Sequence, residues 1–181
     1  MKSFFLYLMV SSTLIACNSN SNNASVTKDS LNPNGINNED AKEERNKQVV
    51  KASTEAYRRR DVEAVAKYFS TDVMDYVDES LPPVRGVDSF KYNRYQFFKA
   101  FPDMEGENLH YAADGDWVIV WGDWSATWKG DFAGQKATGK SFKVQLADIF
   151  KFNEAGKIVE HRGTQSRYEI AYQIGLRISN P

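Results

Sequence analysis

The chain has 181 residues, a formal net charge of −1, 13% aromatic residues and a single cysteine. This length is enough for one domain with a sizeable core. The balanced charge lacks the basic excess of nucleic-acid-binding proteins, so we expect no nucleic-acid partner, and one cysteine excludes an internal disulfide.

The first 16 residues predict a bacterial lipoprotein signal peptide. A short basic start at Lys2 precedes an apolar run, 4–15, that is too short to span a bilayer as a stable helix. The following Leu-Ile-Ala-Cys, residues 14–17, resembles a lipobox, at which a precursor is cleaved and its cysteine lipidated. The resemblance implies that Cys17 becomes the acylated N-terminus, anchored in the membrane of the cell envelope. An ordinary signal peptide, or an uncleaved anchor, with an incidental cysteine is the alternative.

Residues 17–38 are rich in Asn and Ser and have no apolar period, which predicts a flexible tether. Residues 39–181 are left for a folded domain. Within it, helical spacing and end signals predict four helices, at residues 39–60, 62–69, 89–101 and 168–176. Asp61 is the expected N-cap of the second helix, Asp88 or Ser89 that of the third, and Pro102 ends the third.

Stretches rich in β-branched and aromatic residues predict five strands, at residues 73–78, 108–113, 117–128, 142–152 and 157–167. The third and fourth form a long hairpin. Both faces of 117–128 are apolar, so one can face a core while the other needs cover from a partner subunit. A homodimer is therefore expected. Helices followed by a strand, a helix and an antiparallel meander indicate an α+β fold with helices on one face of a curved sheet.

One residue interrupts the apolar face of the strand 142–152, and it is Asp148. A carboxylate on a buried face is costly unless it is paired, hydrogen-bonded or protonated. Such a group can remove a proton next to a carbonyl and return it elsewhere, as in an intramolecular aldol closure or an isomerisation. The alternative is a structural aspartate that accepts hydrogen bonds from Tyr, Trp or backbone donors.

His161 is the second candidate, because it could protonate an enolate oxygen or pair with Asp148. Strand alternation puts Glu160 and His161 on opposite faces, so only one of them can face a pocket, and the pattern leaves open which. The same holds for Asp75 and Tyr76 in the first strand. Tyr57 could add a further polar group, and His110 is a weaker candidate than His161.

Residues 134–141 fit the nucleotide-binding pattern G-x-x-x-x-G-K-[ST]. That mechanism needs a helix directly after the pattern, so that its N-terminus faces phosphate. A strand is predicted there instead, which indicates a hairpin turn. The two histidines are far apart in the chain, and the single cysteine is expected to be lipidated, so they do not form a set of metal ligands. We therefore expect neither a metal nor a cofactor.

Several segments follow one another in a recognisable order: Phe101-Pro102-Asp103, the Trp-rich strand 117–128, the Gly-rich segment 130–134, Thr138-Gly139-Lys140, Asp148, and residues 156–161. Together they resemble the SnoaL-like polyketide cyclase family of the NTF2-like superfamily, over roughly residues 44–167. The resemblance implies a cone-shaped α+β barrel, in which a curved antiparallel sheet carries about three helices on its concave face. It also implies a deep apolar pocket and, commonly, a dimer.

The family's cyclases use an aspartate as acid and base on the strand that matches 142–152, and Asp148 occupies that position. Where they tend to carry a histidine near the end of the preceding strand, this chain has Trp128. We expect a hydrophobic small molecule in a pocket lined by Trp128, Trp124, Tyr76, Phe97 and Phe150. The expected activity is cofactor-free cyclase or isomerase chemistry by Asp148 and His161. A non-catalytic ligand-binding or protein-interaction module on the cell envelope is the alternative.

Overall fold

The computed structural model describes residues 38–77, 82–164 and 167–178. These residues belong to one compact unit, 32–181. The predicted signal peptide, the lipidation site Cys17 and the predicted tether up to residue 37 lie outside the described residues.

The described residues form four helices, close to the predicted ones: α1 (Asn38–Arg58), α2 (Val62–Ala66), α3 (Val87–Ala100) and α4 (Arg167–Ile174). The predicted N-cap of α2 is confirmed, because the Asp61 carboxylate accepts a hydrogen bond of 2.9 Å from the amide of Ala64. The predicted caps of α3 are wrong. Gly86, whose φ is +90°, precedes that helix, and no side chain caps it.

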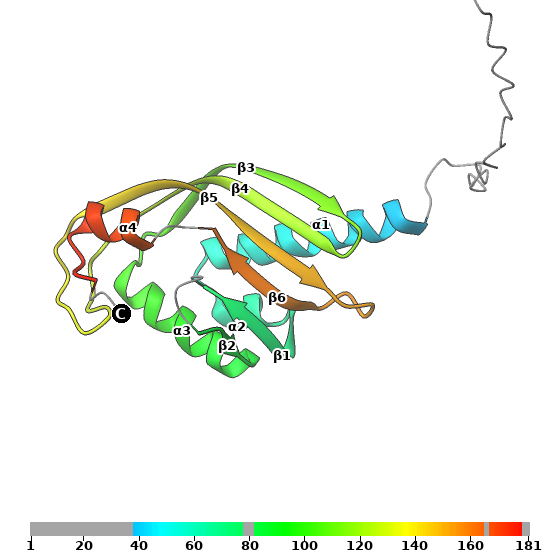
Figure 1. Cartoon of the computed structure of the whole chain (residues 1–181), viewed down its shortest axis with the longest axis horizontal. Coiled ribbons are helices and arrows are strands. Elements are labelled where there is room, and N and C mark those ends of the chain that lie inside the picture. Colours follow the sequence, from blue (N-terminus) through cyan, green and yellow to red (C-terminus); the bar gives the residue numbers. More distant parts are fainter. Residues whose placement is uncertain (1–37, 78–81, 165–166, 179–181) are drawn as a thin grey trace, which may run out of the picture. The chain divides into compact units, whose positions relative to one another are not determined.

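The strands form one six-stranded sheet in the order β2-β1-β6-β5-β4-β3, shown in Figure 1. Their bounds are β1 (Phe69–Tyr76), β2 (Val84–Arg85), β3 (Glu105–Asp114), β4 (Trp117–Thr127), β5 (Ser141–Phe152) and β6 (Ile158–Gly163). The pair β1–β6 is parallel, and the other neighbours are antiparallel. The sheet is curved but unclosed, with β2 and β3 at its edges.

Several predicted boundaries are wrong. The first strand begins at Phe69 rather than residue 73, the strand predicted from residue 108 begins at Glu105, and the short strand β2 was not predicted. The second helix ends at Ala66 rather than residue 69, because Phe69 already begins β1 and pairs with Ile158 of β6. The last strand ends at Gly163 rather than residue 167, and Arg167 begins α4.

The hairpin of β4 and β5 is the longest ladder of the sheet, and its register is unbroken from Trp117 opposite Lys151 to Thr127 opposite Ser141. Ser141, the last residue of the nucleotide-binding pattern, begins β5. A strand therefore follows that pattern, as predicted, and not the helix that phosphate binding by this motif requires.

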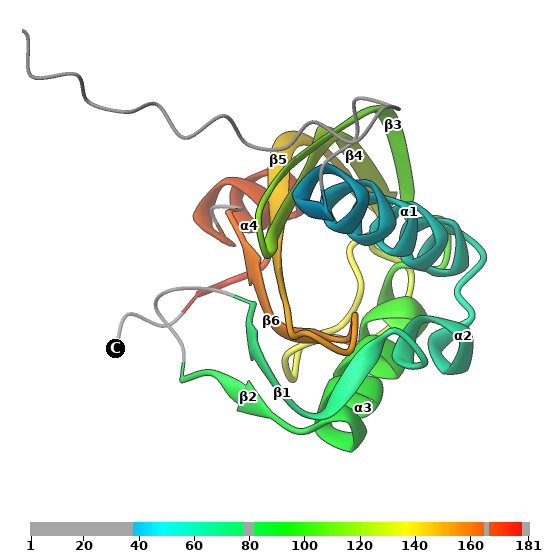
Figure 2. The same ribbon diagram turned by 90° about the vertical axis from the view of Figure 1, so that its right-hand side faces the viewer.

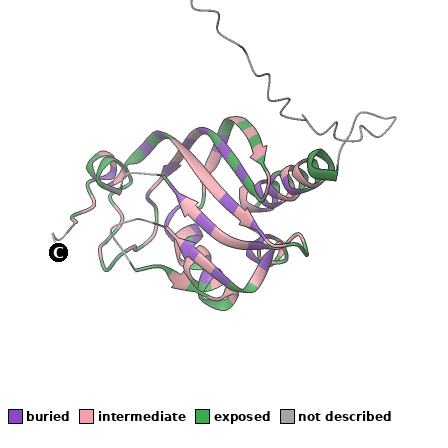
Figure 3. Cartoon of the chain, turned by 45° about the vertical axis from the view of Figure 1, so that its right-hand side comes forward, coloured by how far each residue is buried: buried purple, intermediate pink, exposed green. Residues whose placement is uncertain are grey.

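Helices α1, α2 and α3 lie on the side toward which the sheet curves, as Figure 2 shows. On that side α1 packs on β3 and β4 and α3 packs on β1, and α4 contacts β5. Buried and exposed residues alternate along β4, from Val118 to Ala126, so this strand keeps one face in the core (Figure 3). The core consists of two clusters, one around Val118 and Phe150 and the other around Trp124 and Phe142.

Candidate functional site

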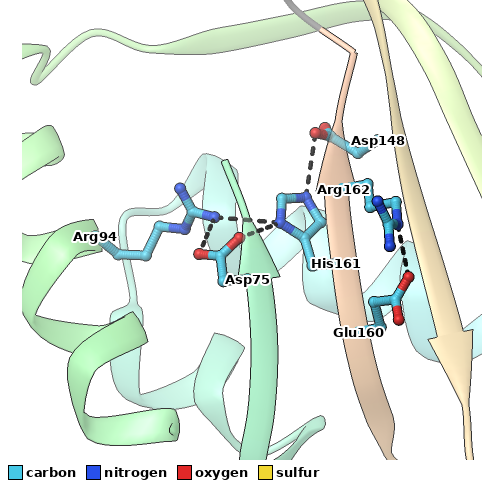
Figure 4. A network of polar contacts seen from close by, with 6 residues as sticks. All are labelled: Asp75, Arg94, Asp148, Glu160, His161 and Arg162. Carbon is cyan, nitrogen blue, oxygen red and sulfur yellow. Dashed lines mark hydrogen bonds and ion pairs between the residues drawn. The ribbon is translucent and has the colours of Figure 1, made fainter. Parts of the chain in front are cut away.

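Four charged side chains meet on the concave side of the sheet, and Figure 4 shows their contacts. Asp75 comes from β1, Arg94 from α3, Asp148 from β5 and His161 from β6. Strand register explains the arrangement. Asp75 lies opposite His161 in the parallel pair, and His161 lies opposite Phe150 in the antiparallel pair. Asp148, two residues from Phe150, is therefore a diagonal neighbour of His161 on the same face.

The imidazole of His161 lies between two carboxylates. Its Nδ1 is 2.7 Å from Oδ1 of Asp75, and its Nε2 is 3.2 Å from Oδ1 of Asp148. A carboxylate only accepts hydrogen bonds, and an imidazole donates through both nitrogens only when it is protonated. The geometry therefore fits an imidazolium that donates to Asp75 and Asp148 together.

Arg94 completes the network from the helix side. Its Nη2 donates to Oδ2 of Asp75 at 3.1 Å and lies 3.5 Å from Nδ1 of His161. Two cations thus converge on the two oxygens of one carboxylate. Asp75 is fully buried, so without these partners its charge would be strongly disfavoured.

The protonation of these groups follows from burial and charge. Burial alone would lower the pKa of His161, but the charge of Asp75 and hydrogen bonds to Asp148 and Asp75 outweigh it and raise the pKa to about 9. Burial opposes the Asp75 anion, yet the charges of Arg94 and His161 hold its pKa below the ordinary value. Burial also opposes the Arg94 cation, and Asp75 raises its pKa. At neutral pH His161 and Arg94 are cations and Asp75 is an anion.

A cavity of about 130 Å³ adjoins this network. Arg94, Asp148 and His161 form its polar end, and the Asp148 side chain keeps 21% of its surface exposed. The remaining wall is mainly apolar and comes from helices and strands alike: Ser53, Thr54, Tyr57, Val65, Phe69, Val77, Phe90, Phe97, Met104, Trp124, Phe142, Leu146, Phe150 and Ile170. The cavity is thus an apolar space with ionic chemistry at one end.

Tyr57 of α1 adds a neutral polar group to the wall. Burial raises the pKa of its hydroxyl to about 12, opposed by the charge of Arg94 and assisted by those of Asp148 and Asp75. The hydroxyl therefore stays protonated at physiological pH and can donate a hydrogen bond to a ligand.

Most of the predicted site residues meet at this cavity, and two do not. Asp148, His161, Trp124, Phe97 and Phe150 all line it. Trp128 and Tyr76 lie elsewhere. The indole of Trp128 is 1% exposed and donates to the carbonyl of Gly130 at 2.6 Å, in the core beside the cavity. Tyr76 is on the other face of β1, where the guanidinium of Arg162 lies 4.0 Å from its ring centre.

The structure decides which residue of β6 faces the cavity. His161 lines it, while Glu160 on the opposite face accepts a hydrogen bond of 2.6 Å from Nε of Arg162 (Figure 4). His110 is exposed and stacks on Trp121, with ring centres 5.2 Å apart, away from the network.

Arg94 was missed as a site residue and Asp75 was left as an alternative to Tyr76, although local signals existed for both. Arg94 follows Phe90 by four residues and precedes Phe97 by three, which places it on the same inward stripe of α3. Asp75 follows the buried Val73 by two residues, so alternation points it inward rather than Tyr76.

Among the described residues, no group of three or more His, Cys, Asp or Glu side chains is placed to hold a metal ion. In the same part of the chain, no helix combines the length and apolarity needed to cross a bilayer.

The curved sheet with helices on its concave side defines a protein of the NTF2-like fold class. The profile of the SnoaL-like polyketide cyclase family matches residues 47–174, and the chain belongs to this family. No curated protein matches the chain significantly.

Solved structures of several bacterial proteins share the fold. A protein of Xanthomonas campestris pv. campestris, provisionally named a polyketide cyclase, is 18% identical with a TM-score of 0.68, over 74% of this chain and 98% of that one. A provisionally named hydroxylase from Streptomyces galilaeus is 24% identical with a TM-score of 0.62, over 75% and 99%. A phenazine biosynthesis-related protein from Pseudomonas aeruginosa is 18% identical with a TM-score of 0.63, over 82% and 92%.

Proposed function

We propose that the chain binds a compact apolar carbonyl compound in its cavity and moves a proton within it, with Asp148 as the acid–base group. One observation carries the proposal. The Asp148 carboxylate lines the cavity, while its partner His161 is a buried cation held from behind by Asp75. A base that faces bound ligand and is backed by a fixed charge network is the arrangement that proton abstraction requires.

The chemistry proceeds in two proton transfers. Asp148 accepts a proton from the carbon next to the carbonyl, and the electrons of the broken C–H bond pass into an enolate. The Tyr57 hydroxyl is the group suited to donate a hydrogen bond to the enolate oxygen, because it stays protonated. Where the ligand carries a C=C bond conjugated with the enolate, Asp148 then returns the proton to the far carbon of that bond and the double bond shifts, which is an isomerisation. Alternatively, the enolate carbon attacks a second carbonyl of the same molecule and the new alkoxide takes the proton, which is an aldol closure.

The size of the cavity limits the ligand. Its volume of about 130 Å³ is similar to that of engineered apolar cavities of about 150 Å³ that hold benzene. A compound with one ring, or a short chain, therefore fits the cavity as it stands. Acetophenone is a suitable first probe, because it combines one ring with a methyl group acidified by a carbonyl.

The test is exchange of the methyl protons of acetophenone in D₂O, followed by proton NMR with wild type and Asp148→Asn. We expect the wild type to accelerate exchange above buffer and the variant to lose this acceleration while still binding the ketone. Asp123→Asn is the matched control, since Asp123 lies on β4 outside the cavity and bonds to Asn108. If a panel of single-ring ketones binds but none exchanges faster than in buffer, the chain is a ligand-binding module and Asp148 is structural.

The cellular location is a separate proposal, supported by sequence alone. The lipobox-like residues 14–17 favour an envelope lipoprotein acylated at Cys17. Cys17→Ser in the full chain should release the protein from membranes on cell fractionation or leave the precursor unprocessed. Unchanged processing and membrane association of this variant would exclude the lipobox.

We also propose a homodimer through the outer face of the sheet. The outward side chains of β4 support this, since Trp117, Ile119 and Trp121 are 37%, 38% and 39% exposed. Three large apolar side chains in a row are unusual on a surface that faces only water.

A further inference from the structure

A second polar group of the cavity wall is unused by the proposed chemistry, and it is the indole of Trp124. Trp124 lines the cavity and is 3% exposed. Its Nε1 is buried and has no hydrogen-bond partner among the described residues. Buried donors in folded proteins nearly always have a partner, so this N–H calls for an acceptor from outside the described residues, and a bound ligand can supply one.

Packing fixes the position of this indole. Its six-membered ring lies against Gly106 of β3, where an added Cβ would be 2.8 Å from Cζ3. Tyr57 meets the same indole edge to face, with ring centres 6.1 Å apart and an interplanar angle of 89°. The N–H is therefore held in a constant place, as a recognition group must be.

Strand β4 determines the distance between the Trp124 N–H and Asp148 at the polar end of the cavity. Asp148 pairs with Val120 of β4, and Trp124 follows Val120 by four residues on the same face. At about 3.3 Å per residue, Val120 and Trp124 are about 13 Å apart along β4. The side chains of Asp148 and Trp124 span part of that distance. A ligand that reaches both groups has a polar atom at each end and an apolar middle.

We infer that the Trp124 N–H is a specificity-determining donor that binds an oxygen acceptor of the ligand at the end opposite Asp148. The inference rests on the proposed function for the location of the ligand, and it narrows the substrate class. The ligand is a compact apolar compound with two oxygen groups, one activated at Asp148 and the other accepting from Trp124. In the free protein a cavity water can serve this donor, and the ligand oxygen replaces it.

The test compares two ketones of nearly equal shape. In 1,4-diacetylbenzene a second carbonyl is available to Trp124, whereas 4-isopropylacetophenone has a methyl group in its place. Nitrogen–proton NMR reports directly on the donor, because each of the four tryptophans gives one indole signal and Trp124→Phe identifies the relevant one. We expect the diketone to move the Trp124 signal downfield and 4-isopropylacetophenone to leave it near its free position.

Affinity supplies a second readout. Trp124→Phe should weaken binding of the diketone by about 3- to 10-fold, the usual net effect of one hydrogen bond, and change binding of 4-isopropylacetophenone much less. Trp121→Phe is the control, since Trp121 is on the outer face of β4. If Trp124→Phe is poorly folded, single Phe variants of the other three tryptophans assign the Trp124 signal of the wild type by elimination, and the shift test still applies.

The inference is wrong if the diketone leaves the Trp124 signal unmoved, or if Trp124→Phe weakens both ketones equally. It is also wrong if neither ketone binds at its solubility limit. Its failure is distinct from failure of the proposed function. If Asp148 catalyses proton exchange but the Trp124 signal does not move, only the role of Trp124 is excluded. If the Trp124 signal moves but no exchange is catalysed, only the proposed proton transfer by Asp148 is excluded.

Discussion

His161 and Asp75 share a hydrogen bond of 2.7 Å at a place where neither side chain is more than 8% exposed. This contact decides the roles in the site. Because Asp75 keeps the imidazole protonated, His161 is a poor base at neutral pH and acts as a fixed positive charge. The cavity-facing carboxylate of Asp148 is then the group that can accept a proton.

The first prediction concerns the pH dependence of folding stability. The pKa of His161 is raised from its ordinary 6.5 to about 9, so protonation favours the folded state. The stabilisation is complete below about pH 6.5 and disappears as the pH rises through about 9. We expect the free energy of unfolding to fall over this range by on the order of 3 kcal/mol, measured by urea titration at a series of pH values.

The control for this prediction is His161→Gln, in which this part of the pH dependence should be absent. Imidazole nitrogen NMR gives the titration directly, and His110→Gln assigns the signals, since the chain has two histidines. An imidazole of His161 that titrates at its ordinary pKa in the folded protein would contradict the charge network.

The second prediction concerns Arg94, whose side chain is 11% exposed and neutralises Asp75. Arg94→Met leaves Asp75 buried with His161 as its remaining cation. We expect a loss of about 2–3 kcal/mol, less than the 3–5 kcal/mol typical when a buried charge loses its whole partner. Adding Asp75→Asn should recover part of that loss, because no buried anion is then left underpaired.

Urea unfolding of the two single variants and the double variant measures this coupling. Arg58→Met is the control. Arg58 is 37% exposed and pairs with Glu105 near the surface, so its loss should cost 1 kcal/mol or less by the usual range of about 0–1 kcal/mol. Strictly additive effects at Arg94 and Asp75 would show that the two side chains do not stabilise each other.

The sequence predicted an element well where its residues form a pattern within one short stretch, and poorly where the element depends on pairing with a distant stretch. The strands of the long hairpin were predicted to within one residue at each end, because alternation extends over β4 and β5. The start of β1 was missed because Ser70, Thr71 and Asp72 give no strand pattern. The residues on either side of this segment, Phe69 and Met74, pair with β6, a contact made much later in the chain.

The same contrast holds for the site residues, some of which follow from a local pattern while others depend on which strands are neighbours. Asp148 was found because a single carboxylate interrupted a strictly alternating apolar face. Its pairing with His161 was only one possibility, since alternation does not tell which strands are neighbours. The contact between Asp75 and His161 joins residues 86 apart and depends on the parallel pairing of β1 with β6, which no local pattern encodes. Trp124 and Trp128 were both expected at the cavity, but of the two only Trp124 lines it, and Trp128 is packed in the core.

The third prediction concerns the outer face of β4. If a second copy covers Trp117 and Trp121, light scattering at high protein concentration should give the mass of a dimer. The double variant Trp117→Ser/Trp121→Ser should be monomeric and remain folded, because both side chains are already partly exposed. Tyr172→Ser is the control, since Tyr172 is 89% exposed on α4. A wild type that is monomeric at every concentration tested would exclude this interface.

The fourth prediction concerns the close contact between Gly106 and Trp124. An added Cβ at Gly106 would lie 2.8 to 3.1 Å from three atoms of the indole ring, closer than ordinary packing allows. Gly106→Ala should therefore push the indole from its place and destabilise the fold by about 1–3 kcal/mol, the usual cost of overpacking. It should also shift the Trp124 indole signal in the absence of any ligand.

The matched comparison is the same substitution in a Trp124→Phe background. Phenylalanine has a smaller ring that reaches less far toward β3, so Gly106→Ala should cost clearly less there, by at least about 0.5 kcal/mol in a double-mutant cycle. Urea unfolding of the four proteins gives this coupling energy. Equal costs in the two backgrounds would mean that the strain arises from the β3 backbone, and that Gly106 does not set the position of the indole donor.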